Sequence, residues 1–439
     1  MSPFDERLHR EHVERRLPSV TAAVVATDEV VWAGAVGARD GRDGAAVDRA
    51  TRYRIGSITK TFVAVAVLRA REQGLLDLST RVRQLLPDAA HASFADVTVA
   101  QLLTHTSGLQ AETRGPWWER TPGLDWPTLR DSALRLAHPP GTRFHYSNVG
   151  YAILGRIVEQ LHGRPWFDVV RDEVLAPIGA ADAMSLRPDT SAAVPLAVHP
   201  HEDLLHAEPE FDAGAMAPAG QVWSSIDGLA RWARFALSDG EGLLSPATMD
   251  LMRVPLAVDD RLGAGWDSAQ GLGWRIWHDG ARRYVGHGGS MPGFLATLKV
   301  EPERGIGVVV LTNTTHGLGE LADGLLREAE SVVPSPAALH PQPSATVREL
   351  LGTWYWGPAP FIAEPHEDGF LLSPAEGAGR GSRFVPDGDG WRGRDGYYAG
   401  ERLIVRDDGA LDLASFIFTR QPYDPAHSYP GDLDPAGWH

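Results

Sequence analysis

The sequence predicts an α+β domain followed by a small all-β domain, and the order of elements along the chain supports this fold class. Valine-rich runs at residues 20–25 and 30–36 predict a β-hairpin near the start, and strand patterns return between residues 273 and 313. The stretch from about residue 80 to 268 has a mostly helical pattern that Pro/Gly loops interrupt. Strands from both ends are therefore expected in one antiparallel sheet, with helices packed against it.

Within this domain the elements follow from hydrophobic periodicity and from capping or turn residues. Residues 60–73 are apolar nearly all round and are followed by Gly74, which predicts a helix buried in the core. A short strand at residues 53–55 leads into it. The remaining helices are predicted at residues 98–103, 128–137, 151–161, 166–174, 226–237 and 318–332, and the remaining strands at 273–277, 283–286, 294–301 and 306–313.

A proline-rich stretch separates the two predicted domains. Prolines at positions 334, 336, 341 and 343 make residues 333–344 a semi-rigid linker, so the domains are expected at 1–332 and 345–439. The second domain has no helical period, and Asp-Gly pairs such as Asp387-Gly388 are typical of tight hairpins. We expect a small β-barrel of the lipocalin kind, acting as a stabilising or lid-like appendage.

The composition argues against several functional classes. The net charge of −16 disfavours nucleic acid and anionic membrane as partners. The absence of cysteine excludes disulfides, thiolate metal sites and cysteine nucleophiles. No apolar run is long enough for a membrane span. Residues 1–17 are charged and lack the apolar region and cleavage site of a signal peptide, which predicts a cytoplasmic protein.

The strongest functional signal is Ser57-Ile58-Thr59-Lys60, directly before the predicted buried helix. Only two of the chain's 41 Lys and Arg residues are lysines, Lys60 and Lys299. Residues i and i+3 share a helix face, so the Ser57 hydroxyl and the Lys60 ammonium are expected to be neighbours. A buried lysine can lose its proton and activate a serine, which arginine cannot do. The pattern predicts a serine hydrolase of the S-x-x-K type, although a helix N-cap serine followed by a surface lysine has the same spacing.

A second motif, Tyr146-Ser147-Asn148, lies just before the helix predicted at residues 151–161. Tyr146 supplies a phenol whose pKa is expected to fall beside a lysine ammonium. Asn148 is able to hydrogen-bond both a substrate amide and Lys60. The motif therefore offers a proton shuttle and a substrate-orienting group for acyl transfer.

A third motif, His287-Gly288-Gly289-Ser290, is expected at the end of an edge strand. Glycine has no side chain, so Gly289 would let a substrate lie against the strand backbone. The backbone amides of Ser290 and Ser57 would then form an oxyanion hole.

These three motifs, in this order, resemble those of the serine β-lactamase and penicillin-binding-protein superfamily. Its class C-like branch, with family VIII esterases, D-aminopeptidases and DD-peptidases, is the most similar, and the resemblance covers about residues 10–332, including the stretches 102–109 and 292–294. It implies a β-lactamase/transpeptidase-like antiparallel sheet flanked by helices, with an all-helical subdomain. It implies neither a cofactor nor a metal.

The resemblance also implies roles for these residues. Ser57 would be the acylated nucleophile, and Lys60 and Tyr146 would form the base that deprotonates it and later protonates the leaving group. Asn148 would orient the substrate. His287 stands where many β-lactamases carry the lysine of K-T-G, and a histidine is largely neutral at pH 7. This departure favours a small ester, amide or peptide substrate, cleaved by a carboxylesterase or D-amino-acid peptidase/amidase activity, over a β-lactamase or DD-carboxypeptidase activity.

Other functions remain as alternatives. A metal hydrolase is disfavoured because His201-Glu202 is followed by His206, one residue too far for the H-E-x-x-H helix. A non-catalytic binding protein on this fold would not need Ser57, Lys60 and Tyr146 together. An acyltransferase would share the acyl-enzyme and differ only in the acceptor.

The sequence does not identify the substrate or the oligomeric state. Trp117, Trp118 and Trp126 lie in one predicted loop and suggest an aromatic-lined cleft. His105 is expected to hold a loop to a helix, while Arg54 and Gln110 lie near the motifs without an assigned role.

Overall fold

The computed structural model describes residues 2–42, 44–280, 282–333, 342–366, 369–377 and 379–422. The chain forms two compact units, Met1–Ser335 and Pro336–His439. Most of the linker predicted at residues 333–344 lies outside the described residues, since these stop at 333 and resume at 342.

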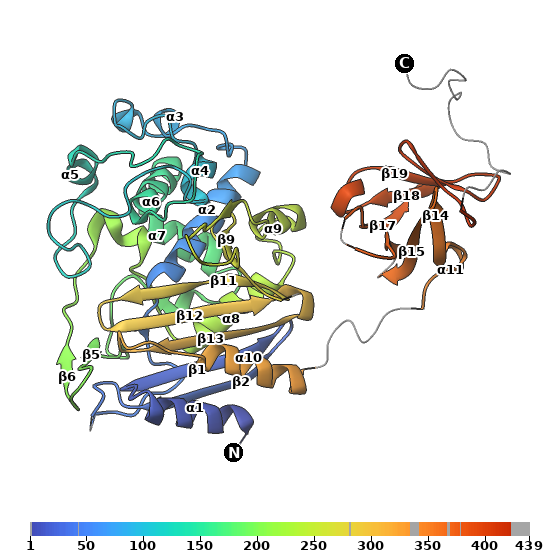
Figure 1. Ribbon diagram of the computed structural model, residues 1–439. Coiled ribbons are helices and arrows are strands. Elements are labelled where there is room, and N and C mark those ends of the chain that lie inside the picture. Colours follow the sequence, from blue (N-terminus) through green and yellow to red (C-terminus); the bar gives the residue numbers. More distant parts are fainter. Residues whose placement is uncertain are drawn as a thin grey trace. The chain divides into compact units, whose positions relative to one another are not determined.

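The first unit is built on one eight-stranded antiparallel sheet, as the sequence predicted (Figure 1). Its strand order is β2-β1-β13-β12-β11-β10-β9-β8, so the initial hairpin pairs with the last strand of the unit, with Val20 opposite Thr312. Both ends of the unit therefore meet in the sheet. The strands are β1 (Ser19–Ala26), β2 (Val30–Gly37), β8 (Ala257–Val258), β9 (Ser268–Gln270), β10 (Arg275–Asp279), β11 (Arg282–Met291), β12 (Phe294–Glu301) and β13 (Ile306–Thr312).

Helices cover both faces of this sheet. Successive residues of a strand point to opposite faces, and in β1 Ala22 and Val24 join the core beneath α1 (Pro3–Glu14) and α10 (Leu321–Val332). Ala23 and Val25 join the larger core on the other side, which includes α8 (Ile226–Leu237). Because β1 is buried on both faces, its sequence is a nearly continuous apolar run and does not alternate between apolar and polar residues.

The helix α2 (Thr59–Glu72) lies in the centre of the larger core, as predicted. It is buried from Thr59 through Leu68, and it packs against α6 (Asn148–His162) and η5 (Gly214–Ala219). A helix apolar all round can be stable only when it is enclosed on every side. This enclosure puts the start of α2, and the residues before it, next to both the sheet and the helical part of the unit.

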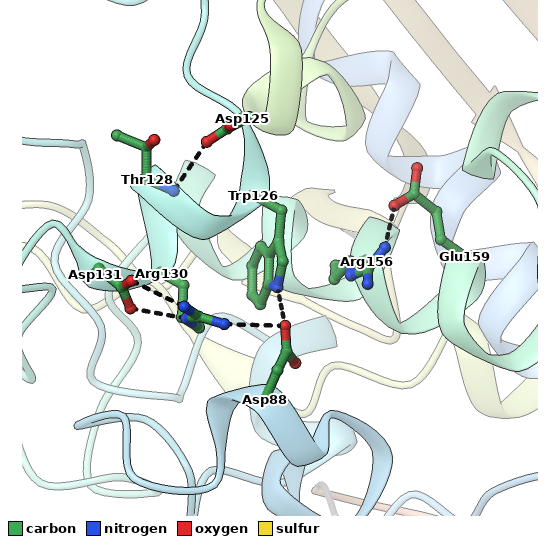
Figure 2. Close-up of polar contacts among 8 residues, drawn as sticks. All are labelled: Asp88, Asp125, Trp126, Thr128, Arg130, Asp131, Arg156 and Glu159. Carbon is green, nitrogen blue, oxygen red and sulfur yellow. Dashed lines mark hydrogen bonds and ion pairs between the residues drawn. The ribbon is translucent and has the colours of Figure 1, made fainter.

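The helix predicted at residues 128–137 is shorter and begins earlier than expected, since α5 spans Trp126–Asp131. Asp125 caps it by accepting a hydrogen bond from the Thr128 amide, and the Trp126 indole donates to Asp88 over 2.8 Å (Figure 2). The chain then leaves the helix, because Ala133 has a φ of 54° and Leu136 forms a β-bridge with Leu109. The helix therefore ends before residue 137, because Leu136 pairs with Leu109 and does not continue the helix that the periodicity predicted.

Several short elements had no sequence signal, although β3 (Tyr53–Arg54) and α4 (Val99–Leu103) match the strand and the helix predicted at residues 53–55 and 98–103. Strands of two or three residues are too short to show alternation, and the segment predicted as one helix at 166–174 divides into an α-turn and a π-helical stretch, Val170–Leu175. The remaining elements are α3 (Val82–Leu85), α4 (Val99–Leu103), α7 (Trp166–Val169), α9 (Pro246–Met252), β3 (Tyr53–Arg54), β4 (Met184–Ser185), β5 (Leu196–Val198), β6 (Leu205–Ala207) and β7 (Trp223–Ser224).

The second unit is an all-β domain, an eight-stranded meander in which each strand pairs with the next. Tyr355 and Thr419 exchange two backbone hydrogen bonds of 2.8 and 3.0 Å, which bring the first and last strands together into a nearly closed barrel. Aromatic side chains such as Phe370 and Trp391 fill its core. After α11 (Ala345–Leu350) come β14 (Gly352–Trp356), β15 (Ala359–His366), β16 (Gly369–Pro374), β17 (Ser382–Asp387), β18 (Gly390–Gly393), β19 (Arg402–Val405), β20 (Leu411–Leu413) and β21 (Phe416–Phe418).

Candidate active site

Ser57 lies in η1 (Gly56–Ile58), a single 3₁₀ turn that leads directly into α2. Gly56 has a φ of 53°, a left-handed conformation that glycine adopts without strain. A Cβ at this position would lie 2.4 Å from the Ser290 backbone nitrogen. Glycine is therefore required for β11 to approach the turn, and this approach places the Ser290 amide beside Ser57.

Lys60 is completely buried and its Nζ contacts three oxygens. The distances are 2.9 Å to Ser57 Oγ, 2.7 Å to Asn148 Oδ1 and 2.5 Å to the Ala219 carbonyl oxygen. Asn148 Oδ1 and the Ala219 carbonyl are pure acceptors, so they take two N–H donors of the amine. In the neutral amine, the remaining lone pair is then available to the Ser57 hydroxyl.

Burial also makes the neutral form of Lys60 accessible. Removal of the ammonium from water lowers the pKa of Lys60 to about 7, against a smaller opposing effect of the Glu112 and Glu119 charges. In a large fraction of the protein molecules Lys60 is therefore unprotonated near neutral pH, as a general base requires. The i,i+3 neighbourhood expected from the sequence is present.

Tyr146 is next to the same serine, but its predicted pKa shift was wrong. Its hydroxyl hydrogen-bonds the Ser57 side chain, and the Lys60 Nζ lies 5.1 Å from its ring centroid. Burial of the phenolate raises the pKa of Tyr146, and this effect exceeds the lowering by the Ser57 hydrogen bond. The phenol is thus protonated at neutral pH and suited to donate a proton.

Asn148 is the first residue of α6, which begins three residues before the predicted start. Ser147 caps the helix by accepting a hydrogen bond from the Gly150 amide over 3.1 Å, and its hydroxyl donates to the Gln110 carbonyl. The Asn148 amide group donates to Glu112 Oε1 over 2.6 Å while its oxygen accepts from Lys60. Its orientation is therefore held from both sides.

His105 supports the Tyr146 motif in a way that the sequence did not reveal. Its Nδ1 accepts a hydrogen bond from the Ser147 amide over 3.1 Å, and its ring lies 4.2 Å from the Tyr146 ring, centroid to centroid. Burial and the nearby positive charge of Lys60 lower the pKa of His105, so the imidazole is neutral. His105 thus holds the loop that carries Tyr146, consistent with the structural role expected for it.

His287 lies within β11, and the expectation of an edge strand was wrong for the strand as a whole. β11 is internal, but β10 pairs with it only as far as Gly286, opposite Arg275. The half of β11 that begins at His287 extends beyond β10 and pairs on one side only, with β12. The glycines therefore do lie along an unpaired backbone edge, because the neighbouring strand is short.

The His287 side chain is neutral. Its Nδ1 lies 2.6 Å from the Gly288 carbonyl oxygen, which can only accept, so Nδ1 carries the proton and Nε2 is a bare acceptor. Burial and the Lys60 charge lower the pKa of His287 to about 3. It does not supply the permanent cation of a K-T-G lysine.

Gly289 faces the backbone just upstream of Ser57. A Cβ at this position would lie 1.9 Å from the Ile55 carbonyl oxygen, whereas a Cβ at Gly288 would contact nothing within 4 Å. The strand can therefore approach Ser57 only because residue 289 has no side chain.

A cavity of about 480 Å³ connects these groups. Ser57, Tyr146 and His287 line it together with Arg261 and Arg275, both of which pair with Asp259 over 2.5 Å. None of the three tryptophans proposed for the cleft is among its lining residues. Trp118 and Trp126 are buried. Trp117 is largely exposed, and the Arg120 guanidinium stacks over its ring.

Two carboxylates near Lys60 were not predicted. Glu112 holds Asn148, and Glu119 accepts from the Trp117 indole, while both charges act on Lys60 and Tyr146. They lie in a loop without periodicity, so only the tertiary structure could place them.

Among the described residues, no group of three or more His, Asp or Glu side chains is arranged to hold a metal ion. The described part of the chain also contains no helix with the length and apolar character of a membrane span.

Comparison with known proteins identifies related sequences. Residues 4–332 match the beta-lactamase family, and residues 343–420 match a domain of unknown function, DUF7586. Penicillin-binding protein 4 of Amycolatopsis lactamdurans is 32% identical over 344 residues, which cover 71% of this chain and 86% of that protein. Esterase EstB of Burkholderia gladioli is 28% identical over 361 residues, which cover 71% of this chain and 89% of that protein.

Solved structures share the fold at lower identity. An octameric penicillin-binding protein homologue from Pyrococcus abyssi superposes with a TM-score of 0.65 at 22% identity, covering 94% of this chain and 98% of that one. D-amino acid amidase from Ochrobactrum anthropi SV3 superposes with a TM-score of 0.65 at 20% identity, covering 75% and 99%. With the S-x-x-K geometry and a family match across most of its length, this chain belongs to the beta-lactamase family.

Proposed function

We propose that the protein is a serine hydrolase that cleaves small esters or amides through an acyl-enzyme at Ser57. The observation that carries this proposal is the buried Lys60 amine, with two fixed acceptors and its third contact at Ser57 Oγ. The two acceptors already hold the amine in place, so the contact with Ser57 is not needed to position Lys60. The same contact does allow the amine to remove the proton of the Ser57 hydroxyl.

The residues support a balanced two-step reaction. Ser57 Oγ attacks the substrate carbonyl carbon while its proton passes to Lys60, and the backbone amides of Ser57 and Ser290 stabilise the oxyanion. The bond to the leaving alcohol or amine then breaks as Tyr146 gives that group a proton, and Tyr146 is reprotonated from Lys60. Water repeats the sequence on the acyl-enzyme. An acyltransferase would differ only in using another alcohol or amine in place of water.

The charges around the site favour an acyl group that carries an ammonium. Glu112 and Glu119 lie close enough to Lys60 and Tyr146 to change their pKa values. A cationic substituent on the acyl side would be attracted by these carboxylates. Amides and esters of amino acids have such a group, and a D-amino acid amidase is among the proteins that share this fold. We therefore place amino-acid amides and esters first among the substrates.

A second candidate is a substrate with an anionic leaving group, as in peptides with a free carboxylate or in β-lactams. Arg275 and Arg261 support it, since both line the Ser57 cavity. Both already pair with the one Asp259 carboxylate, which offsets one of their two positive charges, and His287 is neutral. This candidate therefore ranks below the first.

The test is the mass of the intact protein after reaction with p-nitrophenyl acetate and, separately, with a fluorophosphonate. Wild type is expected to gain one acyl or phosphonyl adduct, and Ser57→Ala none. An adduct of equal amount in both proteins would assign the nucleophile to another residue. No adduct in either would favour a non-catalytic binding protein. The deacylation rate would then rank amino-acid amides, simple esters and β-lactams as substrates.

A further inference from the structure

A second cavity, of about 440 Å³, is lined in part by Arg54, which belongs to the short strand β3 that precedes Ser57. Apolar side chains, including Leu186, Phe211 and Trp223, form part of its wall. Its polar wall contains Arg54, Glu210 and Gln221. None of these residues lines the cavity at Ser57, so the reaction proposed above makes no use of them.

Arg54 is the unusual feature of this cavity. It is 3% exposed, yet no ion pair among the described residues includes it. A guanidinium has five N–H donors. Here Nη2 reaches one carbonyl, that of Phe211, at 3.4 Å, and Nε is buried without a partner in the described part of the chain. Buried charges in proteins are normally paired and hydrogen-bonded, because their removal from water is costly.

Glu210 is the complementary feature. Its side chain is exposed and makes no hydrogen bond or ion pair with any described residue. The two residues are close enough for each charge to act on the other, but they are not in contact. Asp212, the other acid of this wall, is already engaged by Arg187 and Gln221. One cation and one carboxylate are therefore left with unused bonding capacity beside an apolar wall.

We propose that this cavity binds a free α-amino acid with an apolar side chain. The ligand carboxylate would bind the Arg54 guanidinium, whose planar set of donors suits a carboxylate. The ligand ammonium would bind Glu210, and the side chain would pack against Leu186, Phe211 and Trp223. A ligand with only one charge would leave either Arg54 or Glu210 unpaired, which is why we infer a zwitterion.

The cavity is connected to the catalytic residues through the backbone. Arg54 is three residues before Ser57, and Gln221 is two residues after Ala219, whose carbonyl accepts a hydrogen bond from Lys60. Arg54 also acts electrostatically on Glu119. If Ser57 hydrolyses amino-acid amides, the ligand belongs to the product class of the reaction; this last point alone rests on the proposed function.

The experiment is calorimetry on the full-length Ser57→Ala protein, which cannot turn over its ligands. The probes are D-leucine and L-leucine, leucinamide, which lacks the carboxylate, and 4-methylpentanoate, which lacks the ammonium. At least one leucine enantiomer is expected to bind, and each single-charge analogue at least about tenfold more weakly, as expected for the loss of one charged hydrogen-bond partner.

Two added variants assign the charges. Arg54→Met should abolish the preference for leucine over leucinamide, and Glu210→Gln should abolish the preference for leucine over 4-methylpentanoate. Glu202→Gln is the matched control, because it removes an exposed carboxylate from the same segment without lining the cavity. Glu210 is exposed, so Glu210→Gln tests the proposal even if Arg54→Met fails to fold.

Three results would overturn the proposal. The first is no binding of either leucine enantiomer at millimolar concentration. The second is an unchanged preference in Glu210→Gln. The third is loss of leucine binding when Ser57 of the wild-type protein has been blocked by the fluorophosphonate, which would place leucine at the active site. Failure of the proposed function would appear separately, as a missing Ser57 adduct with leucine binding intact.

Discussion

The Lys60 amine lies 2.9 Å from the Ser57 hydroxyl and is completely enclosed by protein. Ser57 stands on the 3₁₀ turn and Lys60 in the first turn of α2, so local helical geometry brings them together. Enclosure by elements that include α6 and η5 then lowers the pKa of Lys60 to about 7. The proximity of Ser57 and Lys60 follows from local helical geometry, whereas the lowered pKa of Lys60 depends on the packing of the whole domain.

Lys60→Met is expected to lower kcat by roughly 10³-fold, the usual contribution of a general base. Lys299→Met is the matched control, because it removes the only other lysine, which pairs with Asp323 at the surface of the sheet. Its kcat should stay close to that of wild type. Steady-state hydrolysis of p-nitrophenyl acetate, with circular dichroism to confirm folding, measures both. Similar losses in the two variants would contradict the role of Lys60.

The pH dependence of kcat/KM should show one acidic limb near pH 7. Lys60 must be neutral to accept the Ser57 proton, and with its pKa at about 7 the active fraction falls about tenfold for each pH unit below that value. The Glu112 charge raises this pKa, so Glu112→Gln should move the limb to lower pH. A glutamine oxygen can still accept from Asn148. A limb that stays in place or moves to higher pH would exclude Lys60 as the titrating group.

Tyr146→Phe should reduce kcat by about 10²-fold or more, since it removes the acid that protonates the leaving group. The loss should be larger for amides than for p-nitrophenyl esters, whose leaving group needs no proton. Tyr151→Phe is the comparison, because Tyr151 also lies near Lys60 but donates its hydroxyl to the Leu103 carbonyl. We expect that variant to lose about 1 kcal/mol of unfolding free energy and to keep its kcat. Equal kcat losses would argue that packing near Lys60, and not proton transfer, is being measured.

Gly289→Ala should destabilise the first unit by about 1–3 kcal/mol, the usual cost of forcing extra atoms into a packed site. The added methyl group would lie 1.9 Å from the Ile55 carbonyl, so β11 would have to move away from the nucleophile turn. Gly288→Ala adds the same group on the open side of the strand and should leave the melting temperature unchanged. Thermal unfolding of the two variants provides the measurement, and equal melting temperatures would show that the strand tolerates a side chain there.

A chain that ends at Val333 should fold and retain acylation of Ser57. The apolar cores of the two units contain separate sets of residues, those of the first unit within 4–333 and those of the second within 347–418. The barrel core is also complete in itself, which favours an independent unit. Soluble expression followed by fluorophosphonate labelling checks this. An insoluble product would mean that the barrel contributes to the stability of the catalytic unit.

The motif residues were predictable because each carries a signal in the linear chain. Ser57 and Lys60 have helical spacing, and Tyr146 and His287 stand in short motifs with a recognisable order. A loop-holding role was expected for His105, but neither its contact with Ser147 nor that of Glu112 with Asn148 has a signal in the linear chain, since these contacts span 42 and 36 residues. The direction of the Tyr146 pKa shift was also wrong, because the nearby lysine was apparent in the sequence while the burial of the phenol was not.

The sequence by itself determined the α+β class, the sheet shared by both ends of the first unit, and the proximity of Ser57 and Lys60 in the candidate site. These depend on hydrophobic periodicity, turn residues and i,i+3 spacing, which are local properties. Only the tertiary structure decided that the pKa of Lys60 falls to about 7, that β11 is internal with one half unpaired on one side, and that Arg54 is buried without an ion-pair partner among the described residues. Desolvation and strand pairing depend on residues distant in the chain, so their outcome appears only when the elements have packed.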